Sequence, residues 1–275
     1  MNRIDQRFQA LAEAGRTALI PYVTAGHPSP DATVEVLHAA VEAGADLLEL
    51  GMPFTDVIAD GPVIQNACSR ALAQGMNLDR VLEMVAAFRQ RDPDTPLLLM
   101  GYTNPIERRG VARFAEDAAR AGVDALLIVD CPADEADELR STLAEHGLHQ
   151  VFLVAPTTTD SRLARTARLV GGFVYYVSIK GVTGAATLDI ASLEPAVERI
   201  RRATELPVAV GFGIREPEQA AAVARCADGV VIGSALVERL DACTTPAQAV
   251  SVAGEYLGAV RNAMDAAAVT QTAKA

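Results

Sequence analysis

Short apolar runs that favour β-strands alternate with amphipathic stretches along almost the whole chain. The strand-like runs number eight, and they cover residues 18–24, 46–51, 96–102, 125–130, 150–154, 173–178, 208–211 and 229–232. In the segments between them, apolar residues recur every three or four positions, as they do in a helix with one buried face. These helical segments are residues 31–42, 78–89, 111–121, 133–145, 161–170, 192–203 and 216–224. Strands that alternate with helices form right-handed βαβ units and a parallel sheet.

The number of units predicts a closed (β/α)8 barrel, the TIM barrel. An open, doubly wound sheet is the alternative, but it rarely needs eight such units, and 275 residues is an ordinary length for one barrel. Residues 3–14 predict an extra N-terminal helix, and residues 249–266 predict a closing helix. We therefore expect a single α/β barrel domain over residues 1–266 and a disordered C-terminal tail over residues 267–275.

Charge and cysteine content exclude several classes of function. The chain carries 35 acidic and 24 basic residues, for a net charge of -11, without any block rich in lysine and arginine. Nucleic-acid binding is therefore not expected. The four cysteines are widely spaced and lack metal-ligand spacing, which predicts a reducing compartment and no bound metal. Neither a secretion signal nor a membrane-length apolar segment is recognisable, so we expect a cytoplasmic protein without membrane contact.

Glu49 places a carboxylate inside the second predicted strand. A strand buried on both faces should be almost continuously apolar, and the neighbours Leu47, Leu48 and Leu50 fit that rule. Strand alternation puts Glu49 on the face of Leu47 and Gly51, which points it into the barrel mouth. A buried carboxyl either finds partners or keeps its proton at a raised pKa, and the second state suits proton transfer near neutral pH. A glutamate paired in the core is the alternative, and we favour chemistry because buried glutamate is rare.

The other predicted strands also end in polar residues or glycine, and in parallel barrels the active site lies at these ends. Asp60 lies in the loop that follows the second strand. Glycine clusters follow the last three strands, at residues 181–184, 211–213 and 233–234, and the last one opens a helix. Backbone N–H groups at such loops and at a helix N-terminus predict a phosphate site without lysine. Each glycine alone is weak support, because turns require glycine in any case.

Several of these segments resemble one enzyme family, in the order in which the family has them. The run from Glu49 to Asp56, which continues into residues 59–65, closely resembles the signature of the tryptophan synthase alpha chain. Further segments that agree are residues 21–28, 100–106, 130, 178, 181–184, 211–214 and 233–235. The similarity covers about residues 3–264.

The resemblance implies a lyase that cleaves indole-3-glycerol phosphate to indole and D-glyceraldehyde 3-phosphate in a retro-aldol reaction. Glu49 would protonate indole C3 and take the hydroxyl proton of the glycerol chain, while Asp60 would stay ionised and accept the indole N–H. Neither a metal nor a Schiff-base lysine is needed, and we interpret Lys180 as a surface residue. This chain is expected to bind no cofactor. The expected partner is the tryptophan synthase beta chain, which holds pyridoxal phosphate, in an α2β2 heterotetramer.

The resemblance and the strand-end positions together indicate which residues contact the substrate. We expect an apolar slot for the indole ring, hydroxyl groups for the glycerol chain and glycine-rich loops for the phosphate, although ordinary core packing explains several positions equally well. The expected substrate-binding residues are Tyr22, Ile64, Met100, Leu127, Tyr175, Thr183, Gly184, Gly211, Phe212, Gly213, Ile232, Gly233 and Ser234. Pro53 and Asp56 are expected at the interface with the partner.

Two positions depart from the family pattern. Val57 stands where the family usually has proline, which predicts a more mobile loop around Asp56 and Asp60, and Lys180 is unusual at its position. Another barrel enzyme, an indole-3-glycerol phosphate synthase or a phosphosugar isomerase, is an alternative, but catalytic lysines at strand ends are scarce here. A barrel that has lost turnover and only activates its beta partner is a second alternative, against which Glu49 and Asp60 argue.

Overall fold

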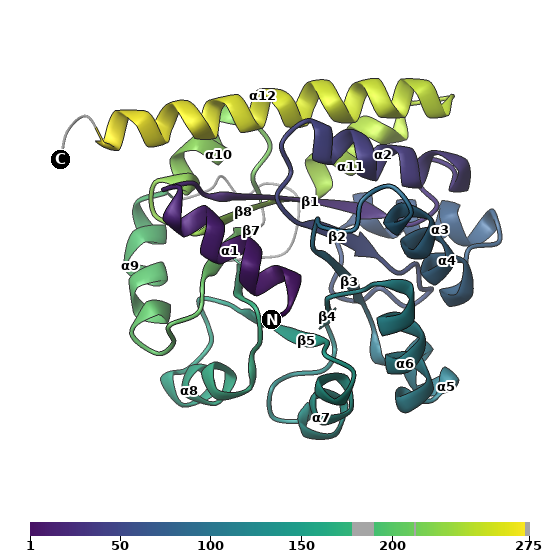
Figure 1. Ribbon diagram of the computed structural model, residues 1–275, viewed down its shortest axis with the longest axis horizontal. Helices are drawn as coiled ribbons and strands as arrows, with labels where there is room; N and C mark the ends of the chain where they lie inside the picture. The colour runs from purple at the N-terminus through teal and green to yellow at the C-terminus, as the bar shows by residue number, and fades with distance from the viewer. Residues whose placement is uncertain (178–189, 212, 273–275) are drawn as a thin grey trace.

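The computed structural model describes residues 1–177, 190–211 and 213–272, and it confirms the predicted (β/α)8 barrel. The strands are all parallel and close in the order β1 to β8 (Figure 1). They are β1 (Ala18–Thr24), β2 (Leu48–Gly51), β3 (Leu97–Gly101), β4 (Ala125–Ile128), β5 (His149–Val154), β6 (Val174–Val177), β7 (Val208–Gly211) and β8 (Gly229–Ile232). Every predicted strand therefore exists, with ends that move by up to two residues.

Helices surround the barrel, and the first of them, α1, covers its amino-terminal end. They are α1 (Arg3–Glu13), α2 (Pro30–Glu42), α3 (Pro62–Ala73), α4 (Leu78–Arg89), α5 (Thr103–Arg109), α6 (Val111–Ala121), α7 (Asp137–Glu145), α8 (Asp160–Leu169), α9 (Ile190–Arg201), α10 (Pro217–Ala224), α11 (Ser234–Asp241) and α12 (Pro246–Thr272). The sequence analysis missed α3, whose small residues blur its periodicity, and α5, which is too short to show one. Helix α7 begins at Asp137 rather than at residue 133.

The C-terminal helix differs from its prediction. Helix α12 spans Pro246–Thr272, so much of the segment expected to be a disordered tail is helical. Residues 273–275 lie outside the described residues. For them the tail stays a prediction, as does the division into one domain and a tail.

Alternating residues of each strand separate the core into two layers. One side chain points into the barrel, as do those of Leu47, Leu98 and Leu127, and the next packs under the helices, as do those of Leu48 and Leu99. This alternation is the two-residue period of a strand. Because the interior layer is almost entirely apolar, the rare polar side chain that points inward must have a chemical or structural reason.

Three aspartates each link two neighbouring strands at the amino-terminal end of the barrel. Each precedes its own strand and accepts a hydrogen bond from the first residues of the neighbouring strand. The bonds run from Leu19 N to Asp46 Oδ2 (3.0 Å), from Leu97 N to Asp124 Oδ2 (2.9 Å) and from Val208 N to Asp228 Oδ2 (2.8 Å). Asp124 also accepts from the guanidinium groups of Arg3 (2.8 Å) and Arg89 (2.9 Å), which ties α1 and α4 to the barrel base.

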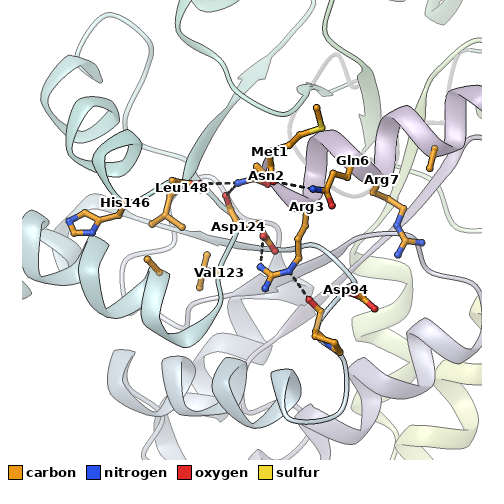
Figure 2. Close-up of a pocket in the computed structure, with 14 residues that line it drawn as sticks. Met1, Asn2, Arg3, Gln6, Arg7, Asp94, Val123, Asp124, His146 and Leu148 are labelled. Carbon is orange, nitrogen blue, oxygen red and sulfur yellow. Dashed lines mark hydrogen bonds and ion pairs between the residues drawn. The ribbon is translucent and has the colours of Figure 1, made fainter.

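A groove of about 820 Å³ opens at this amino-terminal end, between α1 and the segments that precede β4 and β5. Figure 2 shows Arg3 reaching Asp124 across the groove. Asn2 Nδ2 donates to the carbonyls of Asp124 (2.9 Å) and Gly147 (3.0 Å), and Arg3 Nε donates to that of Pro93 (2.6 Å). These polar groups therefore hold α1 against the barrel. They lie at the end opposite to the strand ends that carry chemistry in barrels.

Candidate active site

Glu49 lies in β2 and points into the barrel, where it is 1% exposed. Its register neighbours are Tyr22 on β1 and Leu98 on β3. Its Oε1 has no hydrogen-bond partner within the described part of the chain. Burial, and secondarily the nearby Asp60 carboxylate, raise the pKa of Glu49 to about 8. The side chain is therefore protonated at neutral pH and ready to donate, as the interrupted apolar strand predicts.

Asp60 lies half-buried in the loop between β2 and α3, and one tyrosine holds it in place. The Tyr102 hydroxyl, at the end of β3, donates to Asp60 Oδ2 over 2.8 Å. The Tyr102 hydroxyl oxygen in turn accepts a hydrogen bond from the backbone N–H of Ala59 over 3.2 Å. Burial raises the pKa of Asp60, and the hydrogen bond from Tyr102 opposes that rise. The two carboxyls thus differ, because Asp60 has a donor that stabilises its charge, whereas the described residues supply none to Glu49 Oε1.

Two inward-pointing tyrosines each lie over a glycine of the next strand. A Cβ atom at Gly51 would overlap the Tyr22 hydroxyl, and one at Gly211 would overlap the Tyr175 hydroxyl. Thr24 Oγ1 donates to the Tyr22 hydroxyl over 3.1 Å, which supplies a partner for that buried oxygen. Burial raises the pKa of both phenols, and for Tyr175 the charge of Glu49 is the next cause. Both tyrosines are neutral and frame the site of Glu49.

An apolar cluster forms the wall between these groups and α3. Its buried members are Tyr22, Val57, Ile64, Ala67, Cys68, Tyr102 and Val237, and Phe54, Val63, Met100 and Val129 pack against it. Met100 also touches the interior layer, to which Leu127 and Tyr175 belong. The structure therefore brings Tyr22, Ile64, Met100, Leu127 and Tyr175 to the mouth and interior of the barrel, as expected.

Ile232 does not join this group. It belongs to the outer layer under the helices, because Val231 is the residue of β8 that faces inward. The expectation that Ile232 lines the slot overlooked this alternation. The expected residues Thr183, Gly184 and Phe212, and likewise Lys180, lie outside the described residues.

Two of the glycine-rich segments lie at the ends of β7 and β8. Gly211 ends β7, and Gly213 follows in a left-handed conformation with φ 77°. Gly233 is the N-cap of α11, and Ser234 is its exposed first residue. The first N–H groups of a helix have no partner within it and attract anions. This arrangement is suited to a phosphate group.

The loop of residues 52–61 has one exposed apolar tip. Pro53 and Val57 are buried, Asp56 is exposed and accepts from Thr55 Oγ1 (2.7 Å), and Ile58 is 83% exposed. The sequence analysis overlooked Ile58. It covered Tyr102 only within the matching segment 100–106 and gave it no role, although a tyrosine at a strand end was a usable signal. Asp130, one of the positions that agree with the family, accepts from the N–H and Oγ1 of Thr103 at the start of α5.

The described residues contain no cluster of three or more His, Cys, Asp or Glu side chains that could hold a metal ion. Nor does the described part of the chain contain a helix with the length and apolarity of a membrane span. The fold and the pair of unlike carboxyls are those of a (β/α)8 barrel with side chains suited to acid–base chemistry at its mouth.

Comparison with known proteins identifies the family. The sequence profile of the tryptophan synthase alpha chain matches residues 8–267, and the chain belongs to this family. The alpha chain of Laribacter hongkongensis is 59% identical over 266 residues, which cover 97% of this chain and all of that one. The alpha chain of Thioalkalivibrio sulfidiphilus is 53% identical, with coverage of 96% and 100%.

Solved structures agree with this assignment. Tryptophan synthase subunit alpha from Legionella pneumophila superimposes with a TM-score of 0.89 at 41% identity, over 97% of this chain and 99% of the other. A chain of tryptophan synthase from M. tuberculosis, in the aminoacrylate-bound form, gives a TM-score of 0.83 at 35% identity, over 94% and 100%.

Proposed function

We propose that Glu49 and Asp60 are the catalytic residues of this chain. The reaction is that of its family, the cleavage of indole-3-glycerol phosphate to indole and D-glyceraldehyde 3-phosphate by a lyase. The observation that carries the assignment is the buried Glu49, whose Oε1 has no partner among the described residues and whose pKa is raised to about 8, beside a second carboxyl held by Tyr102. Such a pair can donate a proton at one position and stabilise positive charge at another.

The reaction closes its proton balance with these two groups. Glu49 gives its proton to indole C3, and the positive charge that develops at the ring nitrogen is stabilised by the Asp60 carboxylate. Ionised Glu49 then takes the proton of the glycerol hydroxyl on the carbon attached to the ring. The C–C bond breaks, its electrons restore the aromatic ring, and the hydroxyl carbon becomes the aldehyde. Glu49 ends protonated, as it began.

The remaining residues of the mouth have binding roles in this proposal. Tyr22, Ile64, Met100 and Leu127 contact the indole ring, because they are the apolar groups around the two carboxyls. The Tyr175 hydroxyl binds the glycerol chain beside Glu49. The N–H groups of Gly213, Gly233 and Ser234 bind the phosphate.

The family works with a second subunit, and this chain forms a complex with a tryptophan synthase beta chain. We further propose an α2β2 assembly in the cytoplasm, in which Pro53 and Asp56 lie at the interface. In this assembly the beta chain would hold pyridoxal phosphate and would consume the indole together with serine.

Product analysis tests the proposed function. Purified chain incubated with indole-3-glycerol phosphate should release indole and glyceraldehyde 3-phosphate in equal amounts, and faster when the beta chain is added. Release of neither product, by a chain that demonstrably binds the beta chain, would show that this barrel only activates its partner.

A further inference from the structure

Tyr256 in α12 reaches the loop that carries Gly213. Its side chain is 9% exposed, and its hydroxyl donates to the backbone carbonyl of Arg215 over 2.7 Å. Arg215 follows Gly213 by two residues in the chain. In Figure 1, α10 and α11 both lie along the same side of α12. The C-terminal helix therefore holds, through one buried hydroxyl, the segment that leaves β7.

Arg239 belongs to α11, whose N-terminus is the other part of the proposed phosphate site, and it connects this helix to Tyr256. Its guanidinium lies over the Tyr256 ring, 4.0 Å from the centroid, in a cation–π contact. Its Nη1 donates to the carbonyl of Ala235 over 2.9 Å, within the first turn of α11. Ala235 directly follows Ser234. One tyrosine–arginine pair thus contacts both segments that the proposed phosphate site combines.

Two ion pairs join the same segments. Arg215 pairs with Glu238, and Glu216 pairs with Arg239 over 3.9 Å. The loop supplies Arg215 and Glu216, and α11 supplies Glu238 and Arg239. Each segment therefore carries one positive and one negative charge. These side chains are largely solvent-exposed, and such pairs contribute little individually. The buried Tyr256 is therefore the member on which the relative position of the two segments depends most.

We propose that Tyr256 and Arg239 are positioning residues for the substrate phosphate. Hydrogen bonds weaken steeply when the distance or the angle is wrong, so N–H groups from two separate segments bind one phosphate well only if the segments are fixed relative to each other. Tyr256 holds the Gly213 segment, Arg239 is part of α11, and their stacking holds α11 in place relative to that segment. The inference rests on the phosphate site of the proposed function.

The test is the Tyr256→Phe variant, which removes the hydroxyl but keeps the ring under Arg239. We expect the KM for indole-3-glycerol phosphate to rise about three- to tenfold, the range that one hydrogen bond supplies, while kcat stays nearly unchanged. The inhibition constant of inorganic phosphate should rise by the same factor, and that of indole should not change. Tyr176→Phe, which removes a hydroxyl from the outer layer of β6, is the matched control and should leave all three constants unchanged.

A purely structural role would lower the melting temperature of Tyr256→Phe without changing phosphate inhibition, and that result would overturn the inference. Arg239→Met should raise the same phosphate constant by a similar factor, which gives a second, independent reading.

Ser234→Pro separates failure of the inference from failure of the phosphate site. Proline is tolerated at the first position of a helix and removes one N–H donor there. If Ser234→Pro weakens phosphate inhibition and Tyr256→Phe does not, only the positioning role is wrong. If neither variant changes it, the phosphate binds elsewhere and both proposals fall.

Discussion

Glu49 and Asp60 lie in one site, but their surroundings favour different protonation states of the two carboxyl groups. No donor among the described residues reaches Glu49 Oε1, and burial raises its pKa to about 8, whereas Asp60 accepts a hydrogen bond from Tyr102 that favours its charged form. In the mechanism that we propose, the active state combines a protonated Glu49 with an ionised Asp60.

The first prediction is the pH dependence of kcat/KM in the free enzyme. As the pH rises through about 8, Glu49 loses the proton that it must donate, so activity should fall on the alkaline side. On the acidic side, activity should fall as Asp60 becomes protonated. Steady-state kinetics across this range should give a bell-shaped profile, and constant activity well above pH 8 would contradict the role of Glu49 as the first proton donor.

Tyr102→Phe should move the acidic side of that profile. Removing the hydroxyl takes away a hydrogen bond that lowers the pKa of Asp60, so this pKa should rise and the acidic limb should shift to higher pH. We expect kcat/KM near neutral pH to fall about tenfold, the scale of one hydrogen bond to a charged group. The same kinetic measurement checks this prediction. An unshifted acidic limb would show that Tyr102 does not lower the pKa of Asp60.

Single residues differ in how far the sequence reveals them. Glu49 is predictable because a carboxyl in an apolar strand has few explanations. The bond between Tyr102 and Asp60 is not, because it depends on the path of the loop from residue 52 to residue 61. The inward or outward direction of Ile232 follows from the phase of its strand, which short apolar runs do not display.

At the scale of elements, the amino-terminal end of the barrel is built for stability. Asp124 is almost fully buried and accepts bonds from Arg3, Arg89 and the backbone of Leu97. Replacing it leaves the buried Arg89 without its carboxylate partner, a loss that costs far more than that of an exposed ion pair.

Asp124→Ala should therefore lower the free energy of unfolding by about 3 kcal/mol or more. Asp134→Ala is the control, because Asp134 pairs with Arg162 and Arg165 at the surface and its loss should cost about 1 kcal/mol or less. Denaturant titration measures both. Folded Asp124→Ala protein should keep its turnover. Equal destabilisation by the two variants would contradict the stabilising role of the amino-terminal end of the barrel.

The elements themselves are largely predictable from the sequence. Every strand was expected, because β-rich runs separated by amphipathic helices leave few other arrangements. Helix α3 was missed since its buried face, apart from Ile64, is made of alanine and cysteine rather than large residues. The extent of α12 was underestimated because alanine-rich ends carry no periodic signal.

At the scale of the whole molecule, the loop that bears Asp60 also presents an apolar side chain to solvent. Ile58 is 83% exposed on this loop, while Val57, in the position where proline is usual, is buried against Tyr22 and its neighbours. A partner that covers Ile58 would bias the loop that positions Asp60, and binding and turnover would be coupled by linkage.

Ile58→Asp should weaken binding of the beta chain about tenfold or more, because an apolar anchor is lost and a charge is buried. Folding and the turnover of the isolated chain should change little. Asp56→Ala should weaken binding to a smaller degree. Isothermal titration calorimetry with the beta chain measures the affinity of both variants. Unchanged affinity for the two variants would place the interface elsewhere.

The most direct test of the account is indole release from indole-3-glycerol phosphate by the Glu49→Gln variant. Glutamine keeps the shape of the side chain and cannot transfer a proton, and Glu49 Oε1 has no hydrogen bond to lose within the described residues, so the variant should fold normally. Turnover, with and without the beta chain, should fall by about 10² to 10⁴, the contribution of general acid–base catalysis. Folded Glu49→Gln protein that releases indole at nearly the unmodified rate would contradict the assignment.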